Sequence, residues 1–173
     1  MHKILPLVFS LIALAISVSG LCLPVPFHVK AGEISNPLRG VGSANGGVAQ
    51  DELSLLSVET KSFSSSEKIS ISYGDSNGKP LKGTPGFFQV ALDRDGRRIA
   101  IDLSQITRTG IDPSQLKKIL SKSKYVAMSD MTMDPHDLST NLTFQLNAPV
   151  EVRVSTETGA RSKVILEIKG LTQ

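Results

Sequence analysis

Apolar and polar residues alternate with a period of two along most of the chain between residues 53 and 170. Apolar side chains at every second position, with polar ones between them, are the pattern of half-buried strands in an antiparallel sheet. The apolar positions of these predicted strands are Leu56, Val58 and Thr60; Ile69, Ile71 and Tyr73; Phe88, Val90 and Leu92; Ile99, Ile101 and Leu103; Leu142, Phe144 and Leu146; Val150, Val152 and Val154; and Val164, Leu166 and Ile168. Turns are expected at 93–96, where Gly96 accepts a positive φ, and at 158–160.

One segment between these strands follows a helical pattern instead. Asp112 is a typical N-cap residue, and Pro113 suits the first helical position. Leu116, Ile119 and Leu120 form one apolar stripe, and lysines follow near the C-terminal end, where the helix dipole favours cations. The sequence therefore predicts a single short helix over residues 113–121.

The strands on either side of this helix resemble each other. In each half, a polar-alternating strand precedes a hairpin with a glycine-containing turn, and the last strand of each hairpin carries an acid, Asp102 or Glu167. The two sets are 68–73, 88–92 and 99–103, and then 141–146, 150–154 and 164–168. Such a three-stranded unit exposes an apolar face that needs a cover. We therefore predict an all-β, two-sheet β-sandwich built from an internal duplication of three-stranded units, with one short connecting α-helix.

The first 22 residues have the features of an export signal. A basic start at Lys3 precedes an apolar run of about 15 residues, which is shorter than the roughly 20 needed to span a bilayer. Small residues around Ser19 and Gly20 suit signal peptidase. An uncleaved anchor is the alternative, and it would be the only membrane contact. Leu21 before Cys22 is a poor match to a lipoprotein signal, so we expect Cys22 to be removed or to lie at the new N-terminus.

Residues 23–52 show no sustained period and are rich in Gly, Pro, Ser and Asn. The run at 43–47 (SANGG) has the composition of a flexible linker. We interpret 23–52 as a flexible tether, with short extended pieces around 25–29, and 53–173 as the folded domain. An ordered arm lying on the domain is the alternative to a tether.

Composition limits the functional classes. The chain has 173 residues with a formal net charge of +3, and 40% hydrophobic and 20% charged residues, which excludes a wholly disordered or multispanning protein. One cysteine and three scattered histidines predict no disulfide, no metal site and no cofactor. No nucleophile elbow, P-loop or metalloprotease motif is present, so we predict that the protein is not an enzyme and has no catalytic residues. An exported chain with this small positive charge is not expected to bind nucleic acid.

The stretch from Leu55 to Gly170 resembles the AMIN domain, a β-sandwich module of the bacterial envelope that occurs in N-acetylmuramoyl-L-alanine amidases and type IV pilus secretins. The strand 98–103 (RIAIDL) is similar to the family's Arg-hydrophobic-x-hydrophobic-Asp-hydrophobic strand, and 141–150 (NLTFQLNAPV) to its strand and small-Pro-aliphatic turn. The closing strand at 163–169 also fits. The long loop at 74–86 and the pronounced helix depart from the pattern. The resemblance implies non-catalytic attachment, often to peptidoglycan.

Three candidate sites follow from these residues. Arg94, Arg97 and Arg98 share one predicted hairpin and are the candidate ligand-binding residues, because guanidinium groups bind the carboxylates of peptidoglycan by paired hydrogen bonds. Asp93 and Asp95 beside them offer internal pairing instead, and a solvated turn that binds no ligand is the third interpretation. The acids and His136 of 130–137 match no calcium-loop template and are read as a polar turn. Asp102 and Glu167 are not expected to form a catalytic pair, because both point away from the apolar face.

We therefore expect an exported, periplasmic module for cell-envelope targeting, which attaches to peptidoglycan or to an envelope protein complex. The alternative is an adaptor or accessory subunit of a secretion or pilus complex that binds a protein partner through a sheet edge.

Overall fold

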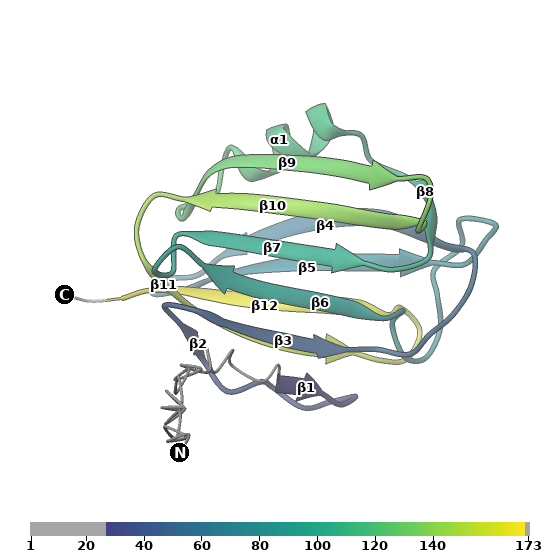
Figure 1. Cartoon of the computed structure of the whole chain (residues 1–173), viewed down its shortest axis with the longest axis horizontal. Helices are drawn as coiled ribbons and strands as arrows, with labels where there is room; N and C mark the ends of the chain where they lie inside the picture. The colour runs from purple at the N-terminus through teal and green to yellow at the C-terminus, as the bar shows by residue number, and fades with distance from the viewer. Residues whose placement is uncertain (1–26, 172–173) are drawn as a thin grey trace, which may run out of the picture.

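In the computed structural model, which describes residues 27–171, two six-stranded sheets pack face to face as a β-sandwich (Figure 1). Sheet A contains, in spatial order, β1 (Phe27–Val29), β3 (Gly42–Gly46), β6 (Phe88–Asp93), β7 (Arg98–Leu103), β10 (Ser139–Leu146) and β9 (Val126–Asp134). Sheet B contains β2 (Leu38–Arg39), β11 (Val150–Glu157), β12 (Lys163–Gly170), β5 (Glu67–Gly74), β4 (Leu53–Ser62) and β8 (Ile106–Thr109). The predicted all-β, two-sheet sandwich with one short helix is confirmed.

The core lies between the two sheets, and the alternation in the sequence explains how it forms. The apolar positions predicted for β5, β6, β7, β10, β11 and β12 are all buried. Among the residues the structure describes, none lies in a helix of the length and hydropathy that a membrane span requires.

The prediction for β4 was wrong at one position, because the strand contains a β-bulge. Its register with β5 shifts between Leu55 and Ser57, which places one extra residue opposite the partner strand. Leu53, Leu55 and Val58 are buried, whereas Leu56 is only partly buried. A strict period of two cannot anticipate this change of phase.

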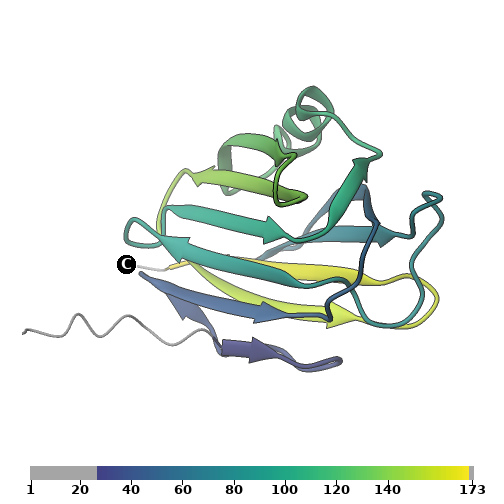
Figure 2. The same cartoon turned by 45° about the vertical axis from the view of Figure 1, so that its right-hand side comes forward.

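The helix α1 (Pro113–Leu120) lies where the pattern predicts it. The Asp112 carboxylate accepts a hydrogen bond of 2.8 Å from the Gln115 amide, and the Gln115 side chain accepts one from the Asp112 amide, which completes a capping box. Leu116 and Leu120 are buried. Figure 1 and Figure 2 show α1 along one edge of the sandwich, where it packs against both β9 and β4.

The two halves of the chain repeat one strand arrangement, and the repeats interleave. The hairpin β4–β5 belongs to sheet B and β6–β7 to sheet A, whereas β9–β10 belongs to sheet A and β11–β12 to sheet B. The halves pair with each other through β7–β10 and β5–β12, and Ile101 lies opposite Leu142 as Leu166 lies opposite Ile69. Each sheet therefore contains strands of both halves. The predicted three-stranded units are not separate sheets, because β5 lies in sheet B and the hairpin β6–β7 in sheet A, and β10 lies in sheet A and the hairpin β11–β12 in sheet B.

The registers match in detail, including the bulge. Gln145 of β10 pairs with Met128 of β9, and the next residue, Leu146, pairs with Val126, so the register shifts by one residue between them. In the first half, Ser72 of β5 pairs with Ser57 of β4, and Tyr73 pairs with Leu55, which is the same shift. The bulge at Leu56 thus recurs at Ala127 in the second half.

The interpretation of 23–52 as a flexible tether was wrong for the residues the structure describes. The segment forms β1, β2 and β3, which pair with strands of both sheets, and Val29, Leu38 and Ala44 are buried. Glycine is required at position 46, since a Cβ there would lie 2.5 Å from the Val29 carbonyl oxygen and 2.9 Å from the Phe88 ring. The small residues that suggested a linker therefore allow close strand packing. The predicted signal 1–22 and the first tether residues lie outside the described residues.

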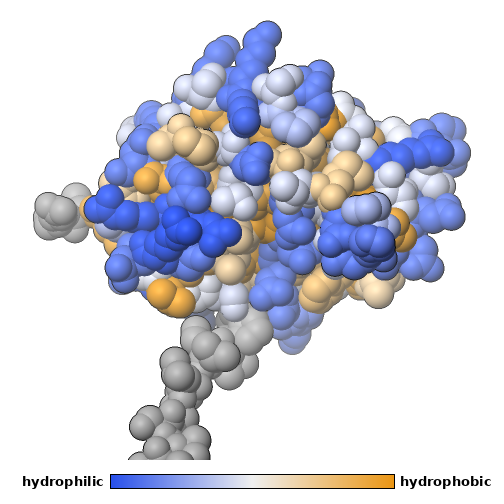
Figure 3. Space-filling view, turned by 45° about the horizontal axis from the view of Figure 1, so that its top comes forward, coloured by the Kyte–Doolittle hydropathy of each residue, from blue (hydrophilic) through white to orange (hydrophobic). Residues whose placement is uncertain are grey.

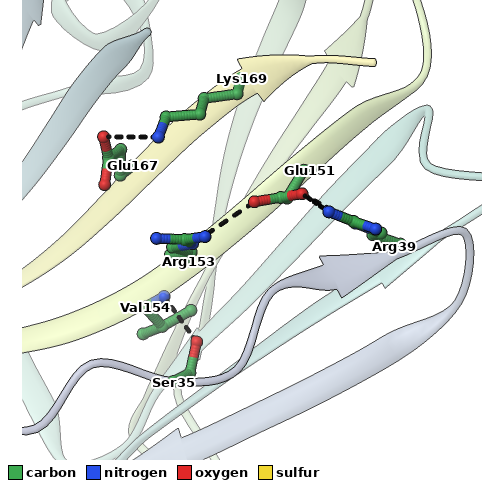
Figure 4. Close-up of polar contacts among 7 residues, drawn as sticks. All are labelled: Ser35, Arg39, Glu151, Arg153, Val154, Glu167 and Lys169. Atoms are coloured by element: carbon green, nitrogen blue, oxygen red, sulfur yellow. Dashed lines mark hydrogen bonds and ion pairs between the residues drawn. The ribbon is translucent and has the colours of Figure 1, made fainter. Parts of the chain in front are cut away.

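Polar contacts fix this N-terminal segment to β11 (Figure 4). Ser35 donates its amide hydrogen to the Val154 carbonyl at 2.7 Å, and its hydroxyl accepts a hydrogen bond of 2.8 Å from the Val154 amide. Arg39 donates to one oxygen of the Glu151 carboxylate at 2.7 Å, and Arg153 contacts the other oxygen at 3.3 Å. These residues behave as an ordered arm, which is the alternative that the sequence left open.

Candidate functional site

The hairpin that carries the three predicted arginines has a tightly fixed turn. Arg94, Asp95 and Gly96 all have positive φ angles, of 52°, 57° and 79°, in the connection between β6 and β7. The Gly96 and Arg97 carbonyls accept hydrogen bonds of 3.0 and 2.9 Å from the amides of Val150 and Leu146. The turn is therefore held against the connection between β10 and β11.

The three arginines do not form one equivalent group. Arg94 and Arg97 are exposed on the turn, whereas Arg98 is partly buried and forms an ion pair of 3.2 Å with Asp93 across the hairpin. Arg98 lines a shallow hollow with residues of β9 and β10, among them Met128 and Gln145. Internal pairing therefore applies to Arg98, whereas Arg94 and Arg97 are exposed, and ligand binding by these arginines stays a prediction.

Hydrogen bonds join this turn to two other segments at the same end of the sandwich. Leu146 is hydrogen-bonded to Arg97, and the amide of the next residue, Asn147, donates a hydrogen bond of 2.9 Å to the Tyr125 carbonyl. The adjacent Lys124 amide donates at 2.9 Å to the buried Glu67 carboxylate, which also accepts from the Ser62 hydroxyl. The β6–β7 turn, the segment before β9 and the β4–β5 turn therefore form one continuous end.

The β4–β5 turn presents an aromatic ring among lysines. The side chain of Phe63 is partly exposed, and the Lys61 and Lys68 ammonium groups lie 5.4 and 5.7 Å from its ring centroid. The Lys124 ammonium donates a hydrogen bond of 2.6 Å to the Phe63 carbonyl. Three cations from separate parts of the chain thus gather around one residue.

Charge is unevenly distributed in this molecule. We define the basic end as the segments 61–68, 93–98 and 117–124, which hold nine Lys and Arg but only three Asp and Glu. The remaining residues of 27–171 hold nine Lys and Arg and thirteen Asp and Glu, so their net charge is negative. In Figure 3, hydrophilic side chains gather on the left, over this end of the sandwich, and also on the right. The small net charge of the chain conceals a concentrated positive surface.

The sequence identified only part of this surface. The arginine hairpin was visible because its residues are adjacent, whereas Lys61, Lys68 and Lys124 join it only through the fold. The lysines near the end of the predicted helix were the one further signal.

Asp102 and Glu167 lie on different sheets, β7 and β12, and face away from the shared core on opposite sides of the sandwich. Burial raises the pKa of the Asp102 carboxyl, and the negative charge of Asp137 raises this pKa further. One Asp102 oxygen is buried without a hydrogen-bond partner in the described structure. The geometry does not bring these two acids together.

The acids after β9 form a turn. The Asp134 carboxylate accepts a hydrogen bond of 2.8 Å from the His136 amide, and the Asp137 carboxylate accepts one of 2.9 Å from the Ser139 amide. Hydrogen bonds from the Ser139 hydroxyl and from the Ser139 amide lower the pKa of Asp137. Within residues 27–171, no three His, Cys, Asp or Glu side chains are close enough to hold a metal ion.

No family model, curated protein or solved structure matches this chain. The resemblance to AMIN domains therefore stays a prediction from the residues of 55–170.

Proposed function

We propose that this protein is a non-catalytic binding module that attaches through its basic end to an anionic polymer of the cell envelope, with peptidoglycan as the expected ligand. The observation that carries this proposal is the uneven distribution of charge, with a strongly positive basic end on a molecule whose remaining described surface is net negative.

The chemistry of the surface suits a repetitive ligand with spaced carboxylates. Arg94 and Arg97 project from a fixed turn and can form paired hydrogen bonds with carboxylates. Exposed lysines such as Lys118 and Lys122 add point charges elsewhere on the basic end. Single exposed ion pairs contribute about 1 kcal/mol or less, so such a surface binds through many weak contacts and is sensitive to salt.

Location and family support the proposal only as expectations. The predicted export signal would place the domain in the periplasm, where peptidoglycan lies, and the AMIN resemblance implies the same ligand.

Co-sedimentation with purified sacculi tests the proposal. The variant Arg94→Asn/Arg97→Gln removes two exposed cations of the basic end, and asparagine tolerates the positive φ at position 94. The matched control Lys79→Gln/Lys82→Gln removes two exposed cations outside the basic end. We expect binding to weaken about fivefold in the first variant and to stay unchanged in the second. Equal retention of both variants, or equal loss, would exclude the basic end as the binding surface.

A further inference from the structure

The edge strand β9 exposes backbone that no other described strand covers. Within residues 27–171, β9 pairs with β10 alone. Along the nine residues of β9, every second residue therefore has its backbone amide and carbonyl directed away from the sheet. Natural edge strands are protected by charges, and Asp130 and Asp134 provide them in the second half of β9. The first half, 126–129, carries no charge. This half is therefore able to accept another strand.

The repeat within the fold indicates what belongs beside it. At the bulge of β4, the outer position of sheet B is filled by β8, which pairs in parallel with residues 53–55. The Gly110 amide extends this contact with a hydrogen bond of 2.7 Å to the Leu55 carbonyl. Leu55 corresponds to Val126 in the register of the second half. The equivalent outer position of sheet A, beside Val126, is therefore a strand position that no described strand fills.

A groove occupies this position. It has a volume of about 240 Å³ and lies between α1 and the first half of β9, lined by Lys117, Leu120 and Ser121 on one side and by 126–129 on the other. Leu120 and Val126 provide apolar surface, and Met128 is 66% exposed. Lys117 brings a positive charge to the groove. An edge strand beside a helix gives a peptide both backbone hydrogen bonds and a place for side chains.

The comparable hollow on the β4 side differs in charge. It is lined by Glu59 together with Lys118 and Lys122, so acidic and basic groups are both present there. In the β9 groove, Lys117 is the only charged lining residue among those described. The charge of Lys117 therefore favours an acidic occupant over a basic one.

We propose that an extended segment of a partner protein adds as a strand to β9 at residues 126–129. Its apolar side chains pack against Met128 and Leu120, and its carboxylates pair with Lys117. This surface shares 117–121 with the basic end but contains neither Arg94 nor Arg97, so the proposal does not rest on binding to an anionic polymer.

The test uses the full chain labelled with ¹⁵N and a synthetic peptide, STEVTVEVTS, whose alternating pattern favours strands. Two control peptides are needed: one with Lys in place of Glu, and one with alternate backbone nitrogens methylated, which keeps the charge but cannot pair as a strand. We expect the first peptide to shift the amide resonances of 126–129 and of the last turn of α1. The methylated peptide should leave them unchanged.

Substitutions on β9 provide the matched control. Met128→Asp places a repelling charge in the groove, whereas Met133→Asp places the same charge at an exposed position near the other end of the strand. We expect Met128→Asp to weaken peptide binding about tenfold and Met133→Asp to leave it unchanged. Shifts confined to 61–68 and 93–98, equal binding of the methylated peptide, or a dimer that Met128→Asp dissociates would each overturn the proposal.

Discussion

At the scale of single residues, Asp102 is in an environment that disfavours its charged form. Its side chain points outward from β7 but is partly buried, one of its oxygens has no hydrogen-bond partner in the described structure, and Asp137 adds like charge. A carboxyl whose pKa is raised by folding binds its proton more tightly in the native state. The contribution of Asp102 to stability is therefore greatest below its unfolded pKa and is lost as pH rises through the folded pKa.

Asp102→Asn should raise the melting temperature at pH 7, because the neutral amide has no charge to desolvate or repel. The gain should diminish as pH falls toward about 4, where the carboxyl itself becomes protonated. Thermal unfolding followed by circular dichroism across this pH range measures both effects.

Glu167→Gln is the matched control. Glu167 lies at the equivalent position of the second half and contacts the Lys169 ammonium at 3.5 Å. Since the substitution removes an ion pair, no gain at pH 7 is expected. A gain of similar size in both variants would mean that the general removal of negative charge, and not the environment of Asp102, is responsible.

At the scale of elements, the strand β3 depends on the absence of a side chain at Gly46. Gly46→Ala would force its Cβ against the Val29 carbonyl and the Phe88 ring, and overpacking of this kind typically costs about 1–3 kcal/mol. Chemical denaturation of the full chain measures this loss.

Ser43→Ala on the same strand, where the side chain is only partly buried, should change the free energy of unfolding by less than about 0.5 kcal/mol. If Gly46→Ala proved equally neutral, the N-terminal segment would act as a tether in solution after all.

These elements also show what the sequence was able to predict. Strands such as β7 and β12 were predictable because one face is wholly apolar and the other polar. β9 was missed because its bulge at Ala127 shifts the phase and its edge position leaves Met128 and Met133 exposed. β3 was missed because its small residues have low strand propensity and are held by their neighbours. The lysines of the basic end come from distant segments, which no local pattern relates.

At the scale of the whole molecule, neither half can complete its own sheets. β7 requires β10 and β5 requires β12, so each half alone exposes apolar faces and unpaired edges. We expect the separate fragments 27–104 and 105–171 to lack cooperative unfolding transitions, and their mixture to regain one. Circular dichroism during denaturant titration distinguishes these states, and a cooperative transition in either fragment alone would contradict the expectation.

The uneven distribution of charge also gives the molecule a direction. The strands run along the long axis in Figure 1, and the basic end lies at one end of it, so positive and negative charge are separated along that axis. The resulting electric dipole experiences a torque in the field of a charged surface, and this field extends over a Debye length of about 8 Å at physiological ionic strength. An anionic layer would therefore receive this protein end-on, and the long edge formed by β9 and α1 would stand upright from the layer, accessible from the side.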